Sequence, residues 1–374
     1  MTIWSILYLA AARQALQVTR ISVVRAASPE TRRSVVASFA CYNSPKQVLQ
    51  MSQVLVVTPA YCTAANNRLP FLLETLYWVK RQSWRNYLHI VVDDGSTDDS
   101  MDVLGQIAAA DARLRIVRKS NGGSSSAINY GVDQALRIAK PEFVTICHSD
   151  DIMLPNSLAA RLQTAEETGA DFVHSDYLLM TEDGVVRHRR AKRIASPAEL
   201  YQRLLALKKG ILYPTMFWRT AFYVEKVGGF DPAITSAEDW DIALRTAKQL
   251  MVDGSGPASC PLPTMLKRNH AGCLRIQNTL DGTKERCYET IYQKHLQGSA
   301  YEAALEKVRR IKVRPPGTGW RPKRAAKAVG RALRLRRVAA LLRLQSGVLL
   351  DKETERFVRE MREIGVKMRG GRAA

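Results

Sequence analysis

The sequence has no closely spaced pair of cysteines. Its six cysteines form no C-x-x-C motif and show no spacing typical of metal ligands, so we expect neither a disulfide framework nor a cysteine-bound metal. Several of them lie in apolar, strand-like surroundings, which favours reduced thiols in a cytosolic compartment. The cysteines are Cys41, Cys62, Cys147, Cys260, Cys273 and Cys287.

The amino end lacks both a membrane-spanning segment and the pattern of a secretory signal. The apolar stretch Ile3–Ala12 is far shorter than the roughly 20 residues that cross a bilayer, and Arg13 follows it instead of preceding it. A strand-like pattern begins directly after Met51, so we expect the native chain to start there, with residues 1–50 as an extension. We expect a cytoplasmic protein, either free or peripheral on the inner face of the plasma membrane.

Acidic residues are scarce relative to basic ones, with 35 against 56 and a net charge of +21. The excess lies at the ends: residues 1–50 carry +5, residues 51–300 carry +2 and residues 301–374 carry +14. A basic chain can bind nucleic acid, but here no aromatic stacking pattern accompanies the basic ends. Nucleic-acid binding through the tail is therefore the weaker alternative to an enzyme.

From Met51 onward, apolar runs alternate with segments of helical periodicity. This alternation is typical of βαβ units and predicts an α/β fold with a mainly parallel sheet over residues 51–298, followed by a basic helical region over 299–374. The Gly/Ser stretch Asn121–Ser126 is expected to break the chain before a helix. The predicted strands are Val54–Thr58, His89–Val92, Leu114–Arg118, Phe143–Cys147 and Asp171–His174; the predicted helices are Leu69–Gln82, Ser100–Ala110, Ala127–Ala139, Pro155–Thr168 and Pro197–Lys208.

Acidic residues gather at three places in this pattern. Asp93 and Asp94 follow one predicted strand, Asp150 and Asp151 follow another, and Glu238-Asp239-Trp240-Asp241 opens a helix-like segment. Ligands and metals collect at the carboxyl ends of the strands in an open α/β sheet. The three clusters therefore predict a metal and a general base around one sheet.

Several sequence blocks occur in a characteristic order between Val54 and His270. They are Val57-Thr58-Pro59-Ala60-Tyr61, Val91-Val92-Asp93-Asp94-Gly95-Ser96-Thr97-Asp98, Asn121-Gly122-Gly123 with Ala127-Ile128-Asn129-Tyr130-Gly131, His148-Ser149-Asp150-Asp151 with Pro155, Gly228-Gly229-Phe230-Asp231, and Ala237-Glu238-Asp239-Trp240-Asp241 with Arg245. Together they resemble the nucleotide-sugar-dependent glycosyltransferases of family 2. The resemblance implies the GT-A fold, a Rossmann-like sheet flanked by helices, and an inverting hexosyltransferase of polysaccharide biosynthesis at the cell envelope.

The resemblance also implies a donor site for a nucleoside diphosphate sugar, which we expect to be UDP-linked. In the family an aspartate hydrogen-bonds the pyrimidine ring, a role that suits a carboxylate because it only accepts hydrogen bonds. Asp94 matches this aspartate, whereas Asp93 and Asp98 equally suit turn formation and helix capping. The predicted donor-binding residues are Pro59, Tyr61, Asp94, Gly122, Asn129 and Ser149.

The metal-binding motif of the family, Asp-x-Asp, matches His148-Ser149-Asp150, so this chain departs from it at the first position. The resemblance implies that Asp150 binds Mn²⁺ or Mg²⁺, with His148 and His270 as further predicted ligands. Hard oxygen ligands suit both ions, whereas imidazole suits Mn²⁺ better. Ribose contact or packing explains His148 equally well, a structural role explains His270 equally well, and Asp151 equally suits helix capping.

The catalytic base of the family is the aspartate of an x-Glu-Asp motif at the start of a helix. Asp239 matches it, and Arg245 follows six residues later. The base would take the proton of the acceptor hydroxyl while a metal offsets charge on the leaving group. Glu238 is predicted to orient the acceptor or Asp239, and Trp240 and Tyr213 are predicted to contact the acceptor. Without the resemblance, these acids would be taken as complements of the helix dipole.

The sequence does not identify the acceptor, which we expect to be a glycan or a lipid-linked glycan. Five basic side chains between Arg187 and Arg193 suit a phosphorylated or lipid-linked acceptor, and equally a solvated loop. Arg321–Leu344 combines many basic residues with an apolar stripe. This segment predicts an amphipathic helix that lies on an anionic membrane surface or packs on the catalytic domain.

Two further interpretations stay open from the sequence. A GT-A-like nucleotidyltransferase would activate a sugar phosphate, but Glu238-Asp239 with Arg245 argues against it because that reaction needs no base of this kind. The departure at His148 leaves room for a non-catalytic relative of the family.

Overall fold

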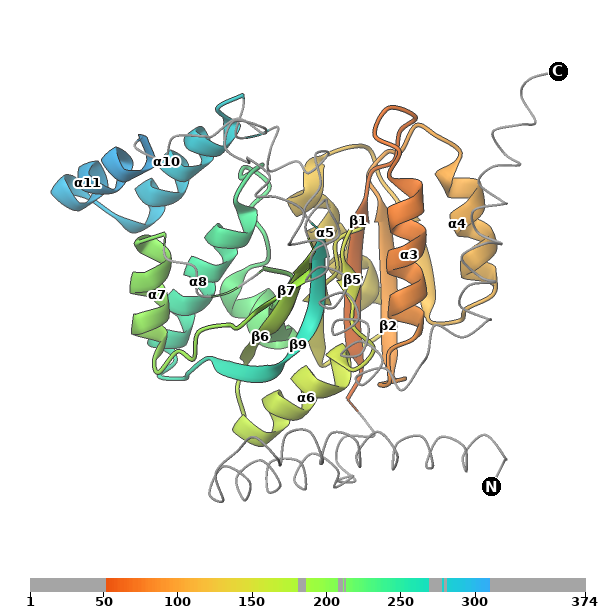
Figure 1. Cartoon of the computed structure of the whole chain (residues 1–374), viewed down its shortest axis with the longest axis horizontal. Helices are drawn as coiled ribbons and strands as arrows, with labels where there is room; N and C mark the ends of the chain where they lie inside the picture. Colours follow the sequence, from red (N-terminus) through yellow and green to blue (C-terminus); the bar gives the residue numbers. More distant parts are fainter. Residues whose placement is uncertain are drawn as a thin grey trace, which may run out of the picture.

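The computed structural model describes residues 52–180, 186–207, 211, 213–268, 278 and 281–309. The predictions for residues 1–50, for the helix over 321–344 and for His270 lie outside these residues. The described chain forms a mixed β-sheet flanked by helices (Figure 1), which confirms the predicted α/β fold.

The sheet has the strand order β3-β2-β1-β4-β8-β6-β9-β5, with β7 paired to β6. Its strands are β1 (Val54–Ala60), β2 (Tyr87–Asp93), β3 (Leu114–Arg118), β4 (Phe143–Ile146), β5 (Ile152–Met153), β6 (Phe172–Met180), β7 (Val186–Arg189), β8 (Phe217–Arg219) and β9 (Ala258–Arg268). The helical elements are α3 (Leu69–Lys80), α4 (Ser100–Ala109), α5 (Gly123–Ile138), α6 (Ser157–Thr168), α7 (Pro197–Leu205), the 3₁₀ turn η2 (Tyr213–Thr215), the π-helical η3 (Phe222–Val227), α8 (Glu238–Val252), α10 (Thr283–His295) and α11 (Gly298–Arg309).

Strand β1 lies at the centre of the parallel half of the sheet. Every residue of β1 is buried, as expected for a strand that is covered on both faces. It pairs in parallel with β2 on one side, where Thr58 lies opposite Val91, and with β4 on the other, where Val57 lies opposite Ile146. Because the chain continues from β1 to β2 on one side while β4 lies on the other, β1 marks a topological switch point.

Beyond β4 the sheet becomes mixed. Strand β8 runs antiparallel to both β4 and β6, whereas β6 and β9 are parallel. The short strand β5 pairs antiparallel with β9, with Ile152 opposite Leu266. This pairing brings the segment that follows β4 next to the carboxyl end of β9.

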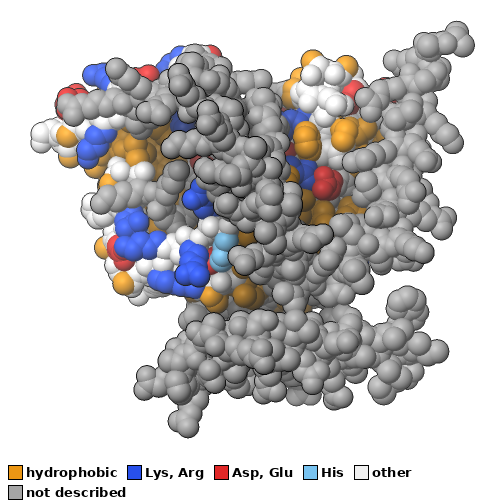
Figure 2. Space-filling model, viewed as in Figure 1, with side chains coloured by type: hydrophobic (Ala, Val, Ile, Leu, Met, Phe, Trp, Pro, Cys, Tyr) orange, Lys and Arg blue, Asp and Glu red, His pale blue; other side chains and the backbone are white. Residues whose placement is uncertain are grey.

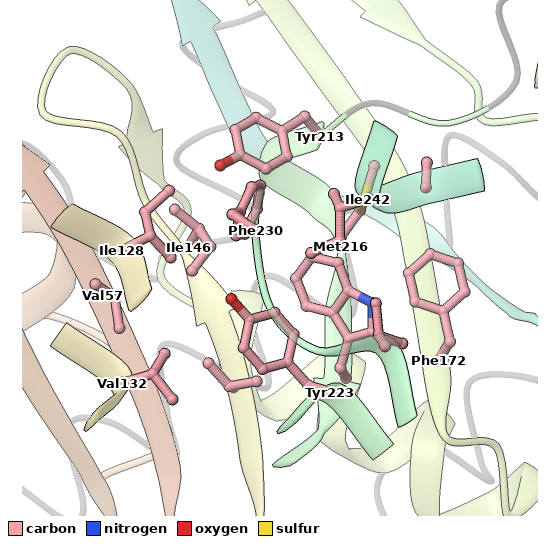
Figure 3. Close-up of a cluster of buried hydrophobic side chains, with 14 of the residues drawn as sticks. Val57, Ile128, Val132, Ile146, Phe172, Tyr213, Met216, Tyr223, Phe230 and Ile242 are labelled. Atoms are coloured by element: carbon pink, nitrogen blue, oxygen red, sulfur yellow. The ribbon is translucent and has the colours of Figure 1, made fainter. Parts of the chain in front are cut away.

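Helices cover both faces of the parallel half. Alternate side chains of a strand point to opposite faces. On one face Ile128 and Val132 of α5 join Val57 in a buried cluster, which continues toward Tyr223 and Phe230 (Figure 3). On the other face, α3 and α4 pack on β1, β2 and β3 (Figure 1). The loops that carry the acidic clusters lie at the carboxyl ends of these strands.

Helix α5 begins earlier than the sequence predicts. The Gly/Ser stretch was expected to break the chain up to Ser126, but α5 starts at Gly123 and includes the three serines. The Asp94 carboxylate accepts hydrogen bonds from the N–H groups of Gly122 and Gly123. A carboxylate at the amino end stabilises a helix, so a residue that directly follows β2 helps to set where this helix starts.

The described residues also bear on the predictions from composition. Cys62, Cys147, Cys260 and Cys287 are buried and free, in keeping with the predicted reduced thiols. None of the described helices combines the length and the apolar character that crossing a bilayer requires.

Helix α5 approaches the sheet closely at Gly131, so a substitution there tests the packing of the helix on the sheet. A Cβ at Gly131 would lie 2.7 Å from Cγ1 of Val57 and 2.8 Å from Cγ2 of Val92. We expect Gly131→Ala to lower the free energy of unfolding by about 1–3 kcal/mol because the helix must move outward. Urea denaturation measures this change.

Gly105 of α4 provides the matched control, since a Cβ there meets nothing within 4 Å. Gly105→Ala should raise the free energy of unfolding by about 0.5–1 kcal/mol through helix propensity. Equal effects of the two substitutions would contradict the packing described for α5.

Candidate functional site

The acidic clusters predicted from the sequence lie around the carboxyl ends of the parallel strands. Asp94 directly follows β2, Asp150 follows β4 by a short turn, and Glu238 and Asp239 open α8. Because β1 separates β2 from β4, the switch point lies between Asp94 and Asp150.

Asp94 is fixed at the amino end of α5. Its Oδ1 accepts from the Gly122 N–H at 3.0 Å and from the Lys119 ammonium at 2.8 Å, and its Oδ2 accepts from the Gly123 N–H at 2.8 Å. The carboxylate therefore occupies a position where helices commonly bind anions. An ionised carboxylate has about four acceptor positions, so Oδ2 retains one for an N–H group of a ligand.

The loop between β1 and α3 is held together by Asn66. The Asn66 Oδ1 accepts from the N–H groups of Thr63 at 3.0 Å and Arg68 at 3.2 Å, and its Nδ2 donates to the Tyr61 carbonyl at 2.9 Å. The Tyr61 side chain is 43% exposed, and Pro59 lies near the end of β1. The loop thus places Tyr61 and Arg68 at the switch point.

Asp150, the predicted metal ligand, forms an ion pair with Arg68. The distance from Arg68 Nη1 to Asp150 Oδ2 is 2.5 Å, and the two side chains are only 13% and 19% exposed. Solvent and salt weaken such a partly buried pair less than a surface pair. The guanidinium therefore competes, through its positive charge and its bond to one oxygen, with a metal ion for this carboxylate. Ser149, a predicted donor ligand, is partly buried in the same turn.

His148 is neutral near pH 7. Burial lowers the pKa of its imidazole to about 4; Asp150 opposes this shift, whereas the charges of Lys267 and Arg68 reinforce it. Its ring centroid lies 4.8 Å from that of Tyr213. A neutral imidazole is the form that ligates metal ions and accepts hydrogen bonds.

Asp151 anchors the end of β9. Its Oδ1 accepts from the Arg268 N–H at 3.0 Å, and Arg268 in turn pairs with Glu74 at 2.6 Å. Burial raises the pKa of Asp151 to about 6; the charge of Lys267 opposes this rise and that of Asp150 adds to it. Helix capping by Asp151 is wrong, since the residue at the amino end of α6 is Asn156.

The side chains around Asp150 suit a divalent ion that is shared with a substrate. Within the ranges given above, no group of three or more His, Cys, Asp or Glu side chains is arranged to hold a metal. Mg²⁺ is commonly held by one or two carboxylates together with substrate phosphates, and Mn²⁺ accepts the same oxygen ligands. Asp150 supplies such a carboxylate, and His148 supplies a neutral imidazole two residues away. His270, the third predicted ligand, is outside the described chain.

Glu238 and Asp239 begin α8 directly after a strained residue. Ala237 has φ 60°, in the left-handed region, which costs a non-glycine residue roughly 1–2 kcal/mol. Strain of this kind is often stored at functional sites. Burial raises the pKa of Glu238 to about 7, and the charge of Asp239 adds to the rise. The Asp239 Oδ1 accepts from the Trp240 N–H at 2.9 Å.

Tyr213 lies between His148, which follows β4, and Phe230, which lies in the loop before α8. Its ring contacts His148 on one side and Phe230 on the other, where the centroids are 5.5 Å apart (Figure 3). Burial raises its pKa well above the usual range, with further contributions from the charges of Glu238 and Asp239. Its hydroxyl is buried and has no hydrogen-bond partner within the described chain. Such a group is costly without a partner, so a ligand hydroxyl or carbonyl would satisfy it.

Asn129, a predicted donor ligand, holds the loop between η3 and α8. Its Nδ2 donates to the Phe230 carbonyl at 2.7 Å, and its Oδ1 accepts from the Phe230 N–H at 2.9 Å. Gly229 has φ +69°, and a Cβ there would lie 2.8 Å from the Asn129 Oδ1. The amide therefore positions a loop that packs against Tyr213, and its contact with a donor stays a prediction.

A network of charges holds the same loop against α8 and α10. The buried Asp241 accepts from Arg245 Nε at 2.9 Å and from Lys294 Nζ at 3.2 Å, and Lys294 also pairs with Asp231. Arg245 donates in addition to the Val227 carbonyl at 2.6 Å. These contacts fix the start of α8, which carries the predicted base.

Trp240, a predicted acceptor ligand, takes part in helix packing. Its indole N–H donates to the Leu204 carbonyl at 2.9 Å. Its ring makes edge contacts with Tyr288 and Tyr292, with centroid distances of 4.9 and 5.0 Å. These contacts put the indole between α7, α8 and α10, and acceptor binding by Trp240 stays a prediction that this packing does not support.

Two basic residues at the site were not predicted from the sequence. Arg68 reaches Asp150 from the loop before α3, and the charge of Lys267 lowers the pKa of His148, Asp151 and Glu238. The available sequence signals were a basic residue directly before the first helix after β1, and a basic residue near the end of a late strand. These signals are weak because most such residues are solvated.

A cavity of about 200 Å³ lies away from this site, between α3, α4 and the first residues of β2 and β3. Its location at the amino ends of these strands separates it from the acidic clusters. It is lined by Leu73, Leu76, Tyr77, Lys80, Tyr87, His89, Val103, Gln106, Ile107, Ala110, Asp111, Arg113 and Leu114.

Residues 56–228 match the family model described as Glycosyl transferase family 2. The glycosyltransferase GlyG of Streptococcus pneumoniae serotype 4 is 35% identical over 129 residues, which are 34% of this chain and 40% of GlyG. WcaA of Escherichia coli K12, a glycosyl transferase named provisionally for colanic acid biosynthesis, is 28% identical over 234 residues, 61% of this chain and 78% of WcaA. The match to GlyG therefore spans less than half of that relative.

A solved structure shares the fold. The crystal structure of S. aureus TarS 1-349 in complex with UDP-GlcNAc superposes with a TM-score of 0.50 at 16% sequence identity, covering 68% of this chain and 71% of TarS 1-349. At this identity the similarity supports the predicted arrangement of sheet and helices.

The two hydrogen bonds of Asn129 give a test of how the loop is held. In Asn129→Asp a carboxylate oxygen replaces the donating nitrogen and faces the Phe230 carbonyl. We expect the free energy of unfolding at neutral pH to fall by about 1–3 kcal/mol, because a bond is lost and two acceptors meet. Protonation restores the donor, so the difference from the wild type should shrink as the pH falls toward about 4.

Denaturant titrations at neutral and acidic pH measure this difference. Asn121→Asp is the matched control, because Asn121 is exposed. A pH-independent loss in Asn129→Asp would show that the amide does not donate to the Phe230 carbonyl.

Proposed function

We propose that this chain, whose residues 56–228 match the family model described as Glycosyl transferase family 2, is an enzyme of that family and transfers a hexosyl group from a nucleoside diphosphate sugar to a hydroxyl of a glycan or lipid-linked acceptor, with inversion. The observation that carries the proposal is that Asp94 and Asp150 follow the two strands that flank the switch point at β1. Asp239 is linked to them through Tyr213, which contacts His148 and whose pKa is raised in part by the charge of Asp239. The UDP-GlcNAc bound in TarS favours a UDP-linked donor, and the name of WcaA favours an acceptor of polysaccharide biosynthesis.

On the donor side, the base binds next to β2 and the diphosphate next to β4. The free acceptor position on Asp94 Oδ2 suits the ring N–H of uracil. Gly122 and Gly123 keep the backbone at the amino end of α5 close to Asp94. The exposed ring of Tyr61 lies on the loop between these two ends and can cover the base or the ribose.

Asp150 would hold a divalent ion together with the donor phosphates, with His148 as a second ligand. Such an ion offsets the negative charge that develops on the leaving diphosphate. The protein contributes a carboxylate that is only 19% exposed, so solvent competes weakly for it.

On the acceptor side, Asp239 acts as the general base. It takes the proton of the acceptor hydroxyl as that oxygen bonds to the anomeric carbon, and the bond from that carbon to the diphosphate oxygen breaks with its electron pair on the diphosphate. One displacement of this kind inverts the anomeric centre. Glu238 directly precedes Asp239, and Tyr213 is close enough for the charges of both to raise its pKa. In this proposal Glu238 and Tyr213 orient the acceptor.

The test is a panel of UDP-, GDP- and dTDP-sugars with Mn²⁺, Mg²⁺ or EDTA. We expect metal-dependent binding of one donor, which Asp150→Ala abolishes. Asp239→Asn should bind that donor normally but turn over about 100-fold or more slowly, because it lacks a general base. Calorimetry measures binding, and release of the nucleoside diphosphate measures slow donor hydrolysis.

Asp133→Asn is the control for the carboxylate changes, because Asp133 is 55% exposed on α5 and forms a surface ion pair with Arg137. It should leave both readouts unchanged. If no nucleotide sugar binds under any metal condition, the catalytic proposal fails and the chain is a non-enzymatic relative.

We expect the titration of Glu238 to make kcat/KM depend on pH. Its carboxyl has a pKa of about 7, so it becomes neutral as the pH falls below that value. Loss of this negative charge makes Asp239 a weaker base, and kcat/KM should fall on the acidic side of pH 7. In Glu238→Gln that titration is absent, so the acidic limb should move to lower pH. A pH–rate profile of both proteins measures the shift, and an unchanged acidic limb would rule out Glu238 as its source.

A further inference from the structure

Arg68 is held in place by contacts within the protein, which form without a ligand. The Asn66 side chain accepts a hydrogen bond from the Arg68 N–H. It also accepts from the Thr63 N–H and donates to the Tyr61 carbonyl, and these bonds fix the loop. Asn67, between them, has φ 44°, in the left-handed region that asparagine tolerates better than most residues. The guanidinium then reaches Asp150, 82 residues further along the chain, at 2.5 Å. The loop therefore holds the Arg68 guanidinium against Asp150, the carboxylate that is predicted to bind the metal.

The topology places this cation where a diphosphate would lie. Strand β1 is flanked by β2, which ends at the predicted base site near Asp94, and by β4, which leads to Asp150. In a nucleoside diphosphate the two phosphates connect the base and ribose to the metal end. The loop after β1 carries Arg68 and lies between these two ends, at the switch point where ligands of such sheets bind.

Other positive groups on the base side of this edge are already used by the protein. The amino end of α5 and the Lys119 ammonium both bind the Asp94 carboxylate. Arg68 instead binds a carboxylate that the metal also needs. A guanidinium pairs with carboxylate and phosphate oxygens in the same geometry, so a diphosphate can replace Asp150 as its partner at little cost.

We propose that Arg68 is a ligand of the donor diphosphate and that its guanidinium rests on Asp150 when no donor is bound. This inference rests on the proposed function for the existence of a donor. The inference adds an exchange of partners. When the diphosphate binds, the Arg68 guanidinium leaves Asp150 and pairs with the diphosphate, so that the Asp150 oxygen becomes available to the divalent ion. Binding of phosphate and binding of metal are thereby coupled through one side chain.

The exchange predicts opposite effects of one substitution. In Arg68→Gln, Asp150 loses its competing cation, so Mn²⁺ alone should bind about tenfold more tightly than to the wild type. The same variant should bind pyrophosphate in EDTA about tenfold more weakly, because a charge-assisted hydrogen bond is lost. Electron paramagnetic resonance measures free Mn²⁺, and calorimetry measures pyrophosphate binding.

Two further variants test the same exchange from the other side. Asp150→Asn removes the resting partner of Arg68 and a repelling charge, so pyrophosphate in EDTA should bind more tightly. Arg68→Lys keeps the positive charge and should retain most of the pyrophosphate affinity. Arg137→Gln is the matched control, because Arg137 also pairs with an aspartate, at 3.1 Å, but on the exposed face of α5.

Neither readout needs a sugar, an acceptor or turnover, so the result does not depend on whether glycosyl transfer is found. A merely structural role of Arg68 would weaken Mn²⁺ and pyrophosphate binding together, and thermal unfolding would report the same damage. Weaker binding of both ligands, unchanged binding of both, or no pyrophosphate binding by the wild type in EDTA would each overturn the proposal.

Discussion

The parallel pairing of β1 with both β2 and β4 is the constraint on which the rest of the structure depends. It forces three strands to end at one edge and makes β1 a switch point, so the loops after these strands face a common space. Asp94, Arg68 and Asp150 come from three segments that are far apart in sequence, and this pairing alone brings their loops together. The mixed half of the sheet then adds the end of β9 and the start of α8.

Much of the polar chemistry at this edge holds loops in place. Asp94 satisfies the amino end of α5, Asn129 pairs with both backbone groups of Phe230, and Asp241 joins Arg245 to Lys294. Buried polar groups need such partners because their desolvation is otherwise costly. The consequence is a pre-formed site in which a few groups, above all the Tyr213 hydroxyl, keep hydrogen-bonding capacity for a ligand.

The fold and the positions of the acids could be predicted from the sequence because both depend on local pattern. A buried parallel strand is a continuous apolar run, and the residue that follows it reaches the ligand edge. Directions and partners of side chains could not be predicted, because they depend on contacts between distant segments. Asn129 and Trp240 are predicted as ligands, but the sequence does not show that Asn129 also holds a loop and that Trp240 also holds a helix interface. Arg68 looks like a loop residue in the sequence, and in the structure it pairs with Asp150. The early start of α5 has the same origin, since Asp94, from a distant segment, accepts hydrogen bonds from the N–H groups of Gly122 and Gly123.

The measurement that tests this account most directly is a crystal structure of the protein with UDP and Mn²⁺. The account predicts that the nucleotide lies across the ends of β2, β1 and β4, with its base at Asp94, its diphosphate at Arg68 and the ion on Asp150. A nucleotide bound elsewhere, for instance in the cavity between α3 and α4, with the Arg68–Asp150 ion pair intact, would contradict it.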